Sequence, residues 1–324
     1  MKAYWKIILV VILGLILLGG VQHNWKRHFA PGLRQLQAEW VGPPLQWVMI
    51  NVSTRNLQGD AHLIRTKGEK TILIDVGYYA PAKEQLVPFL QDQAITRIDS
   101  LFVTHPHRDH YEGIKALLEA GIKIGEVYFN LPDQVLCDRE LPWGCNYQDL
   151  LRYHKMLRDA QIPLRQAKAG LALDLGQGAK LDILYAFSNA DLPTKRHDIN
   201  DLSMIMKLRY QGVEVLFTGD LNLFLGKWLA QHGKDLQAEI LKVPHHGVAG
   251  IAPSAFFRKV APEAAMVPGP SGLWCSKRGS QVRNWAAQAG VKLYVNGFLG
   301  HVTVDFEEED YSIHSQRQSN QECN

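Results

Sequence analysis

From about residue 46 onward, the chain alternates between two patterns of apolar and polar positions. Short runs rich in β-branched and aromatic residues predict strands, and turn residues separate most of them. The expected strands are 47–52, 61–65, 71–74, 100–103, 126–129, 181–185, 203–210, 213–217, 239–242, 265–267, 292–295 and 301–306. Apolar positions with helical spacing predict helices at 82–90, 111–120, 147–160, 223–231 and 282–288.

This order of elements predicts an α/β fold. Several strands in the first half follow one another without an intervening helix, which argues against a simple Rossmann arrangement. We expect two mixed sheets in the middle with helices outside. The pattern places one domain at 46–310, a juxtamembrane tether at 23–45 before it and a polar tail at 311–324 after it.

The first 22 residues predict a membrane anchor or signal segment. Ile7 to Val21 carries no charge and is preceded by Lys2 and Lys6. This stretch is short for a span of roughly 20 residues, but the residues before it can extend it into the interface and Lys6 can snorkel. A single-pass transmembrane helix is the preferred interpretation. A cleaved signal peptide is the alternative, although no cleavage site stands out near Leu18 to Gly20.

The cysteines bear on the compartment of the domain. Cys137 and Cys145 flank a short loop that a disulfide would close, which suits an oxidising compartment; two unpaired thiols remain the alternative. Basic residues lie on both sides of the apolar segment, so the charge rule does not decide its orientation. We expect an extracytoplasmic domain because N-terminal anchors most often serve exported domains.

Composition and charge exclude several classes of protein. The chain is 46% hydrophobic and 21% charged, which is ordinary for a globular domain. Its 35 basic and 32 acidic side chains give a net charge of only +3, so bulk electrostatics do not predict nucleic-acid binding. No nucleophile elbow or phosphate-binding loop is present, which leaves covalent serine catalysis and nucleotide-driven work unsupported.

The strongest chemical signal is the segment Thr104 to His110, with the sequence THPHRDH. It lies between a predicted strand and a predicted helix, where side chains project into a common cleft. Three imidazoles and one carboxylate within six residues are the ligand mixture that suits zinc or another divalent transition metal. Alternating spacing places His105 and His107 on one side, while Asp109 and His110 can reach a second ion.

Three other predicted strands end in residues of matching chemistry. Asp75 follows the strand at 71–74, Asp220 follows the strand at 213–217, and the pair His245 and His246 follows the strand at 239–242. Each signal alone is weak, since a Gly-Asp after a strand is usually a turn and a histidine pair is usually structural. Together with the histidine-rich segment they predict one metal site.

The order Asp75, HPHRDH, FTGD and PHHG resembles the metallo-β-lactamase fold. The resemblance is closest to the branch that includes the C-terminal domain of bacterial DNA-uptake (competence) channel proteins, and it runs from about Trp47 to Phe306. Supporting segments are Gln58 to Ala61, LIDVG, AKAGLALDLG, Asn200 to Ser203, LFTGDL and LKVPHHG. The resemblance implies a four-layer αββα sandwich with two divalent ions, zinc or manganese, at the edge where the sheets meet. It also implies a bacterial inner-membrane location.

The resemblance implies a role for each matching residue. His105 and His107 are expected to ligate the first metal, and Asp109, His110 and His245 the second, with Asp220 bridging both ions. Asp75 is expected to orient a ligand histidine, and His246 to donate a proton to the leaving group. The third histidine of the first site is not obvious; His197 is a candidate, and so is a plain surface role for it. His301 is either a pocket residue or a strand surface residue.

These expectations lead to three alternative functions. The first is a phosphodiesterase or nuclease in which a binuclear metal-bound hydroxide attacks and Asp109 and Asp220 orient it. The second is an extracytoplasmic hydrolase of a small ester, lactone or choline-phosphate substrate. The third is a non-catalytic membrane-tethered metal-binding module. No protein partner is inferred.

Departures from the branch concern the pocket rather than the metal ligands. Glu112 replaces a common Gly, Val248 replaces a usual Ser, and the connector before Gln58 is longer. Basic residues at 195–197 and at 277, 278 and 283, with Trp274 and Trp285 nearby, are candidate contacts to a phosphate backbone, although a solvated surface explains them equally well.

Overall fold

The computed structural model describes residues 40, 42–54, 57–68, 70–142, 144–188, 198–248, 250 and 252–323. The predicted anchor at 1–22, most of the tether and His197 lie outside these residues. Among the residues that are described, no helix combines the length and the apolar character needed to cross a bilayer. The residues from Trp40 onward form one compact unit.

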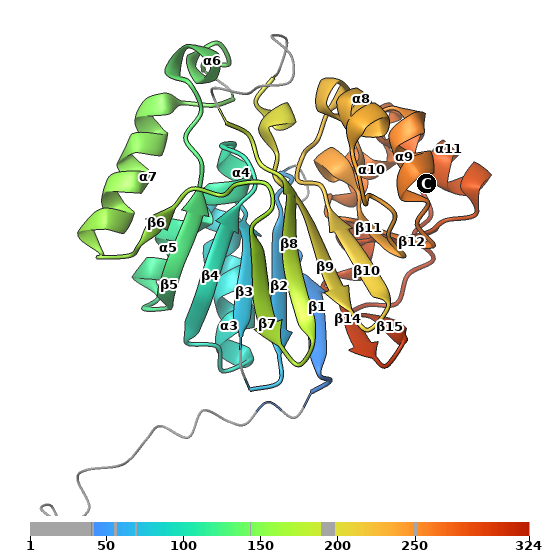
Figure 1. Ribbon diagram of the computed structural model, residues 1–324, viewed down its shortest axis with the longest axis horizontal. Coiled ribbons are helices and arrows are strands. Elements are labelled where there is room, and N and C mark those ends of the chain that lie inside the picture. Colours follow the sequence, from blue (N-terminus) through green and yellow to red (C-terminus); the bar gives the residue numbers. More distant parts are fainter. Residues whose placement is uncertain are drawn as a thin grey trace, which may run out of the picture. The chain divides into compact units, whose positions relative to one another are not determined.

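Two sheets form the centre of this unit (Figure 1). The first has eight strands in the order β15-β14-β1-β2-β3-β4-β5-β6. Strands β3 to β6 run parallel and the others pair antiparallel. Their bounds are β1 Leu45–Met49, β2 Ala61–Thr66, β3 Thr71–Val76, β4 Arg97–Val103, β5 Lys123–Phe129, β6 Leu164–Arg165, β14 Val302–Glu307 and β15 Asp310–Ser315.

The second sheet has seven strands in the order β13-β12-β11-β10-β9-β8-β7. Strands β10 to β13 are parallel, and β7 to β10 are antiparallel. Their bounds are β7 Ala172–Gly176, β8 Ala179–Tyr185, β9 Ile205–Tyr210, β10 Val213–Phe217, β11 Ile240–Lys242, β12 Ala264–Val267 and β13 Lys292–Val295. The prediction of two mixed sheets is therefore confirmed.

Helices lie outside both sheets, as Figure 1 shows. The described helices of the first half are α2 Tyr79–Pro81, α3 Val87–Asp92, α4 Arg108–Tyr111, α5 Gly113–Glu119, α6 Gln134–Asp138 and α7 Tyr147–Asp159, with the π-helical turn η1 Ala82–Leu86 joining α2 to α3. Those of the second half are α8 Leu223–His232, α9 Ser254–Val260, α10 Ser271–Cys275, α11 Ser280–Ala289 and α12 Asn296–Leu299. Short 3₁₀ turns lie at η2 Asn200–Leu202, η3 Pro244–Gly247 and η4 Lys277–Gly279.

The alternation of side chains along the strands produces two apolar cores. In β3, Ile72 and Ile74 face the core between the sheets, whereas Leu73 faces the helices. The rings of Trp47 and Phe217, one from each sheet, meet edge to face at 4.9 Å. Burying one such side chain contributes about 1.5–3 kcal/mol to the stability of the fold. Strands that are apolar on both faces are therefore stabilised by packing against the other sheet and against the helices.

The C-terminal boundary of the domain is corrected by the structure. Residues 311–315, assigned to a polar tail, belong to β15, which pairs with β14 along its whole length. A disulfide between Cys275 and Cys323 ties the last described residue to α10. Only Tyr311 and Ile313 of this edge strand are apolar and pack on the core, and so short an alternation among polar residues resembles a tail.

Candidate metal centre

The predicted ligands lie on loops that follow strands of both sheets. Strand β3 carries Asp75 near its end, β4 leads to His105–His110, β10 leads to Asp220, and β11 leads to the pair at 245–246. Strands β3 and β4 are parallel, as are β10 and β11, so the carboxyl ends within each pair point to the same edge. The first half of the chain and the second half each contribute part of one site.

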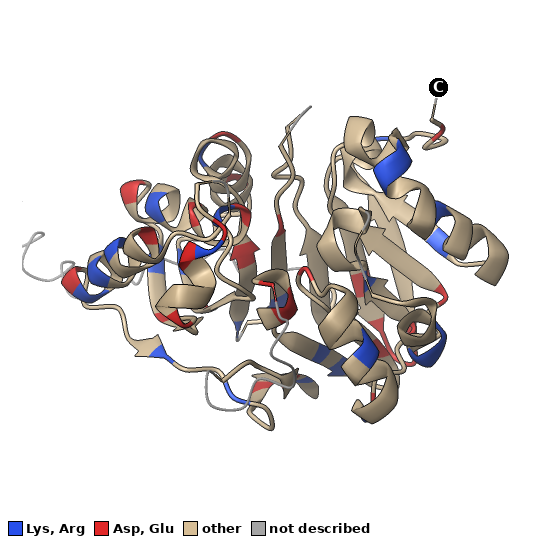
Figure 2. Ribbon diagram, turned by 90° about the horizontal axis from the view of Figure 1, so that it is seen from above, with Lys and Arg blue, Asp and Glu red and all other residues tan. Residues whose placement is uncertain are grey.

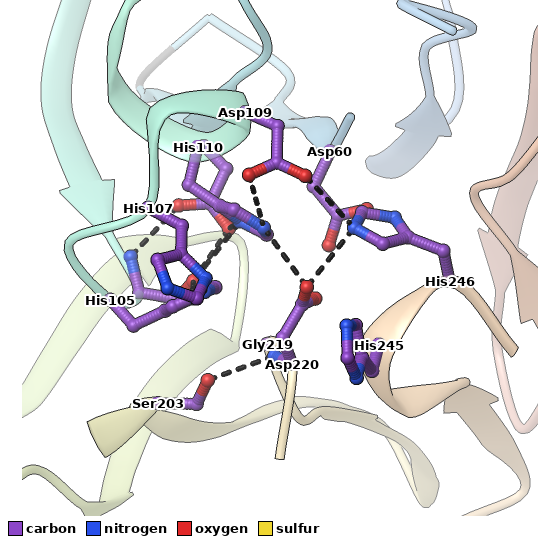
Figure 3. A network of polar contacts seen from close by, with 12 residues as sticks. Asp60, His105, His107, Asp109, His110, Ser203, Gly219, Asp220, His245 and His246 are labelled. Carbon is purple, nitrogen blue, oxygen red and sulfur yellow. Dashed lines mark hydrogen bonds and ion pairs between the residues drawn. The ribbon is translucent and has the colours of Figure 1, made fainter. Parts of the chain in front are cut away.

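Four buried side chains form the centre of this site: Asp109, His110, Asp220 and His246. One ligand atom from each lies within 4.8 Å of those from all the others. His246 Nε2 is 3.0 Å from Asp220 Oδ2 and 3.3 Å from Asp109 Oδ2. His110 Nε2 is 3.3 Å from the same oxygen of Asp220. Asp220 therefore lies between the two imidazoles (Figure 3).

A second group adjoins this one. His105 Nε2 is 3.2 Å from His107 Nδ1, and the rings of His105 and His110 are 4.1 Å apart. Both side chains lie on the side of His110 that is away from His246 (Figure 3). The structure thus brings the two groups of predicted ligands together as neighbours, while their assignment to individual ions stays a prediction.

Each imidazole of the two groups is held through the ring nitrogen that does not face the centre. Such partners fix the tautomer and the orientation of a ligand histidine. The contacts are His105 Nδ1 with Thr104 Oγ1 at 3.2 Å, His107 Nε2 with Glu140 Oε2 at 2.7 Å, His110 Nδ1 with Asp75 Oδ2 at 2.8 Å, and His246 Nδ1 with the Pro268 carbonyl at 2.8 Å.

Asp75 lies where the sequence analysis expects it, beside a histidine of the centre. Besides contacting His110, its carboxylate accepts hydrogen bonds from the backbone and the hydroxyl of Thr104 at 2.8 and 2.7 Å. Its backbone is left-handed, with φ of 57°. This conformation costs energy in a residue with a side chain and is typical of functional sites. The carboxylate thereby joins the ends of β3 and β4.

The histidine pair differs from the sequence-based assignment. His246, expected to be a proton donor, takes part in the four-residue group in the place expected for His245. His245 Nδ1 instead lies 2.8 Å from Asn222 Oδ1. Both residues are left-handed, with φ of 47° and 53°. These angles are those of neither a strand nor a helix. The periodicity of the sequence therefore could not indicate which of the two adjacent histidines points to the centre.

A buried ion pair behind the centre was missed by the sequence analysis. The ammonium of Lys242, at the end of β11, pairs with Asp60, lies 3.5 Å from Asp220 Oδ1, and donates to the Gly219 carbonyl at 2.6 Å. Asp60 Oδ1 is also 3.1 Å from His246 Nδ1. The segments around Asp60 and Lys242 entered the sequence analysis only as support for the family resemblance. A lysine in a short strand is ordinarily expected to be exposed to water.

The charges of the centre shift the pKa values of its members. Burial alone would raise the pKa of Asp220, but His246 and His110 outweigh it and hold the pKa well below its usual range. Burial would lower the pKa of His110 and His246; the surrounding carboxylates, Asp220 foremost, raise both well above the usual value. Burial and the neighbouring His110 lower the pKa of His105. Asp220 is therefore ionised at neutral pH.

The donor set fits a divalent transition metal. Imidazole and carboxylate are its usual ligands. The Nε2 atoms of His110 and His246 are buried and have no hydrogen-bond partner among the described residues, although both face carboxylates. A buried polar atom without a partner is costly, and coordination to a cation would satisfy both nitrogens.

Comparison with known proteins bears on this arrangement. Residues 54–127, which contain Asp60, Asp75 and the whole histidine-rich segment, match the family model of the metallo-β-lactamase superfamily. The matched segment, which contains β2, β3 and β4, is therefore similar to this superfamily. The contributions of Asp220 and His246 to the centre come from beyond the matched residues.

Two curated relatives are similar to a larger part of the chain. ComE operon protein 3 of Bacillus subtilis is 22% identical over 192 residues, 58% of this chain and 22% of the relative. Competence protein ComA of Neisseria gonorrhoeae is 23% identical over 242 residues, 73% of this chain and 29% of the relative. The chain thus spans less than a third of either relative. Among solved structures, the metallo-β-lactamase fold protein YhfI of Bacillus subtilis has a TM-score of 0.49 and 13% identity, covering 78% of this chain and 96% of that chain.

Other candidate residues lie away from the candidate metal centre. His301 Nδ1 accepts from the Asn51 backbone at 3.0 Å, and its ring packs on Phe89 at 4.8 Å. Trp274 is buried, and Trp285 packs on Phe257 at 4.3 Å. Arg283 donates to backbone carbonyls of Trp274 and Ser276. These three side chains of the candidate phosphate-binding patch have structural partners, and Lys and Arg are spread over helices on both sides of the described chain (Figure 2).

Proposed function

We propose that this protein is a metal-dependent hydrolase of phosphodiesters that holds two divalent ions, zinc or manganese, at the junction of its two sheets. The observation that carries the proposal is the buried group of Asp109, His110, Asp220 and His246, with His105 and His107 adjoining it. Four ligand-type side chains converge there. Two of their ring nitrogens, His110 Nε2 and His246 Nε2, have no hydrogen-bond partner among the described residues, and a bound cation would satisfy both.

The residues divide between the two ions according to their positions. Asp109, His110 and His246 would hold one ion and His105 and His107 the other, and Asp220, which lies between the groups, would be available to both. His245 is the candidate for a further imidazole on the ion assigned to His105 and His107, since it lies next to Asp220 (Figure 3). His246 is a ligand in this proposal, which replaces its expected role as proton donor.

The ions, when bound, supply Lewis-acid polarisation of the phosphoryl group and lower the pKa of water. The protein supplies orientation and proton transfer. Asp109 and Asp220 both have lowered pKa values, because nearby imidazoles outweigh the effect of burial. Ionised carboxylates next to the attacking water are the groups that orient it and accept its proton. Lys242 places a buried positive charge beside Asp220.

Two further facts support the choice of substrate and compartment. One curated relative is named a competence protein, so a nucleic-acid backbone is the first phosphodiester to test. Disulfides Cys137–Cys145 and Cys275–Cys323 support an extracytoplasmic location, because such bonds persist in oxidising compartments. Anchoring to a bacterial inner membrane by residues 1–22 belongs to the same proposal.

The test combines metal analysis with a panel of substrates. Purified protein should hold close to two transition-metal ions per chain and cleave bis-nitrophenyl phosphate, single-stranded DNA or double-stranded DNA with Zn²⁺ or Mn²⁺. Turnover of a lactone or ester alone would replace the phosphodiesterase with a small-ester hydrolase. Bound metal without any turnover would leave a non-catalytic module.

Variants connect the activity to the site. Asp109→Ala and Asp220→Ala should each lower turnover by about 10²–10⁴-fold while the domain stays folded. His301→Ala is the matched control, since this histidine lies outside the two groups and contacts Asn51 and Phe89. Retained activity in either aspartate variant would contradict the site.

A further inference from the structure

Glu140 connects the candidate metal centre to a disulfide-closed loop. Its Oε2 atom is 2.7 Å from His107 Nε2 and accepts a hydrogen bond from the Cys145 backbone at 3.1 Å. Its Oε1 atom accepts from the Ile199 backbone at 3.2 Å. One carboxylate therefore holds together a histidine of the centre, the end of the loop and the segment that leads to η2.

The contact determines which ring nitrogen of His107 faces the centre. An ionised carboxylate only accepts hydrogen bonds, so the proton of a neutral His107 ring must reside on Nε2. The lone pair of Nδ1 is then directed to the side of His105, whose Nε2 is 3.2 Å away. This is the tautomer that a metal ligand needs when it binds through Nδ1.

The loop that carries Glu140 is anchored at both ends by a covalent bond. Cys137 lies in α6 and Cys145 directly precedes the N-cap of α7; the two are joined as a disulfide and both are buried. The side chain of Glu140 itself is 24% exposed. Its carboxylate is thus partly open to water, and its position depends on how firmly the backbone of the loop is held.

We propose that Glu140 is a positioning residue for His107 and that the Cys137–Cys145 disulfide keeps Glu140 in place. The crosslink thereby sets the affinity of the ion held by His105 and His107. The consequence for metal binding rests on the proposed function, whereas the orientation of the His107 ring does not.

Metal titration with a chromogenic chelator tests the effect on affinity. Glu140→Ala should weaken one of two Zn²⁺-binding steps by about 10–100-fold and leave the other unchanged, which is the usual consequence of losing the partner of a ligand histidine. Glu140→Gln, which keeps an acceptor oxygen, should fall between Glu140→Ala and wild type. Cys137→Ser/Cys145→Ser should weaken the same step as Glu140→Ala.

Two matched controls separate this effect from general loosening. Cys275→Ser/Cys323→Ser removes the other disulfide, and Asp138→Asn alters a carboxylate of the same loop that contacts the Tyr147 backbone instead of a histidine. Both should bind Zn²⁺ as wild type does. Equal weakening in either control would overturn the proposal, as would unchanged binding in Glu140→Ala. Unchanged binding in Cys137→Ser/Cys145→Ser would overturn the part assigned to the disulfide.

Long-range ¹H–¹⁵N spectra of the metal-free protein provide a readout that needs no bound ion. At a pH high enough to make the ring neutral, His107 should be the Nε2-protonated tautomer in wild type and a mixture of tautomers in Glu140→Ala. The same mixture in both proteins overturns the proposal. If wild type binds no metal but its tautomer responds to Glu140, the proposed function fails and the positioning role stands.

Discussion

Lys242→Met is the substitution whose effect on stability the structure determines most directly. Lys242, Asp60 and Asp220 each have only 1% of the side chain exposed, and the ammonium of Lys242 contacts both carboxylates. The substitution keeps most of the apolar stem but removes the ammonium. Asp60 then retains only imidazole partners for its buried charge.

The expected cost follows from the burial of the partners. Removing one member of a buried ion pair leaves an uncompensated charge and costs about 3–5 kcal/mol. Burial would lower the pKa of Lys242, but Asp60 and Asp220 raise it above its ordinary value. The stabilisation is therefore fully present below the unfolded-state pKa of the lysine and is lost only as pH rises through the higher folded-state value. The full effect should be present at pH 7.

Lys207→Met is the matched control. Lys207 is equally buried, lies in β9 of the same sheet and pairs with Glu214 at 2.7 Å and Asp235 at 3.0 Å. These carboxylates are 26% and 51% exposed, so water can solvate them once the ammonium is gone. We expect a loss of about 1–2 kcal/mol, below the cost of leaving a fully buried charge unpaired.

Urea unfolding in the presence of a chelator measures both variants. Lys242→Met should lower the free energy of unfolding by about 1–4 kcal/mol more than Lys207→Met, which is the difference between the two expected losses. Asp60→Asn added to Lys242→Met should recover part of the loss, because it removes the unpaired charge. Equal losses for the two lysine variants would refute the argument from partner burial.

Three other predictions concern pH and metal. Because His110 and His246 have raised pKa values and hold protons in the metal-free protein, Zn²⁺ must displace them; calorimetry should record proton release, and affinity should rise with pH from 6 to 8. Burial and Asp198 raise the pKa of Asp201 to about 7, so Asp201 keeps a proton in the folded protein that it loses in the unfolded chain. The stability that protonated Asp201 contributes is present below the unfolded-state pKa and is lost as pH rises through about 7. Asp201→Asn should flatten this decline in urea unfolding at pH 5 and 8. Saturating Zn²⁺ at 100 times its dissociation constant should add about 2.7 kcal/mol per site to the free energy of unfolding, and no shift in thermal unfolding on chelation would contradict a native metal site.

The sequence predicted those parts of the site that depend on strand ends. A buried strand followed by ligand-type residues places them at the edge of a sheet, and the structure brings Asp75, Asp109, His110 and Asp220 together at such an edge. The two-sheet fold followed from strands that succeed one another without a helix between them. Both inferences use local patterns that the chain displays over a few residues.

Features that depend on contacts far apart in the sequence were not predicted. Glu140 contacts His107 across 33 residues, and Lys242 contacts Asp60 across the two sheets. The sequence around each of these residues does not distinguish it from a charged residue exposed to water. The inward turn of His246 depends on left-handed backbone angles, which residues with side chains adopt only when the surrounding structure imposes them.

The order of the ligands along the chain has a consequence for biosynthesis. Asp109 and His110 are adjacent, whereas Asp220 and His246 follow only after the remaining strands of the first half and most of the second sheet have been made. A growing chain therefore has no complete four-residue group until β11 and the turn after it have left the ribosome. A cation that needs all four side chains can therefore bind only after the chain has passed His246.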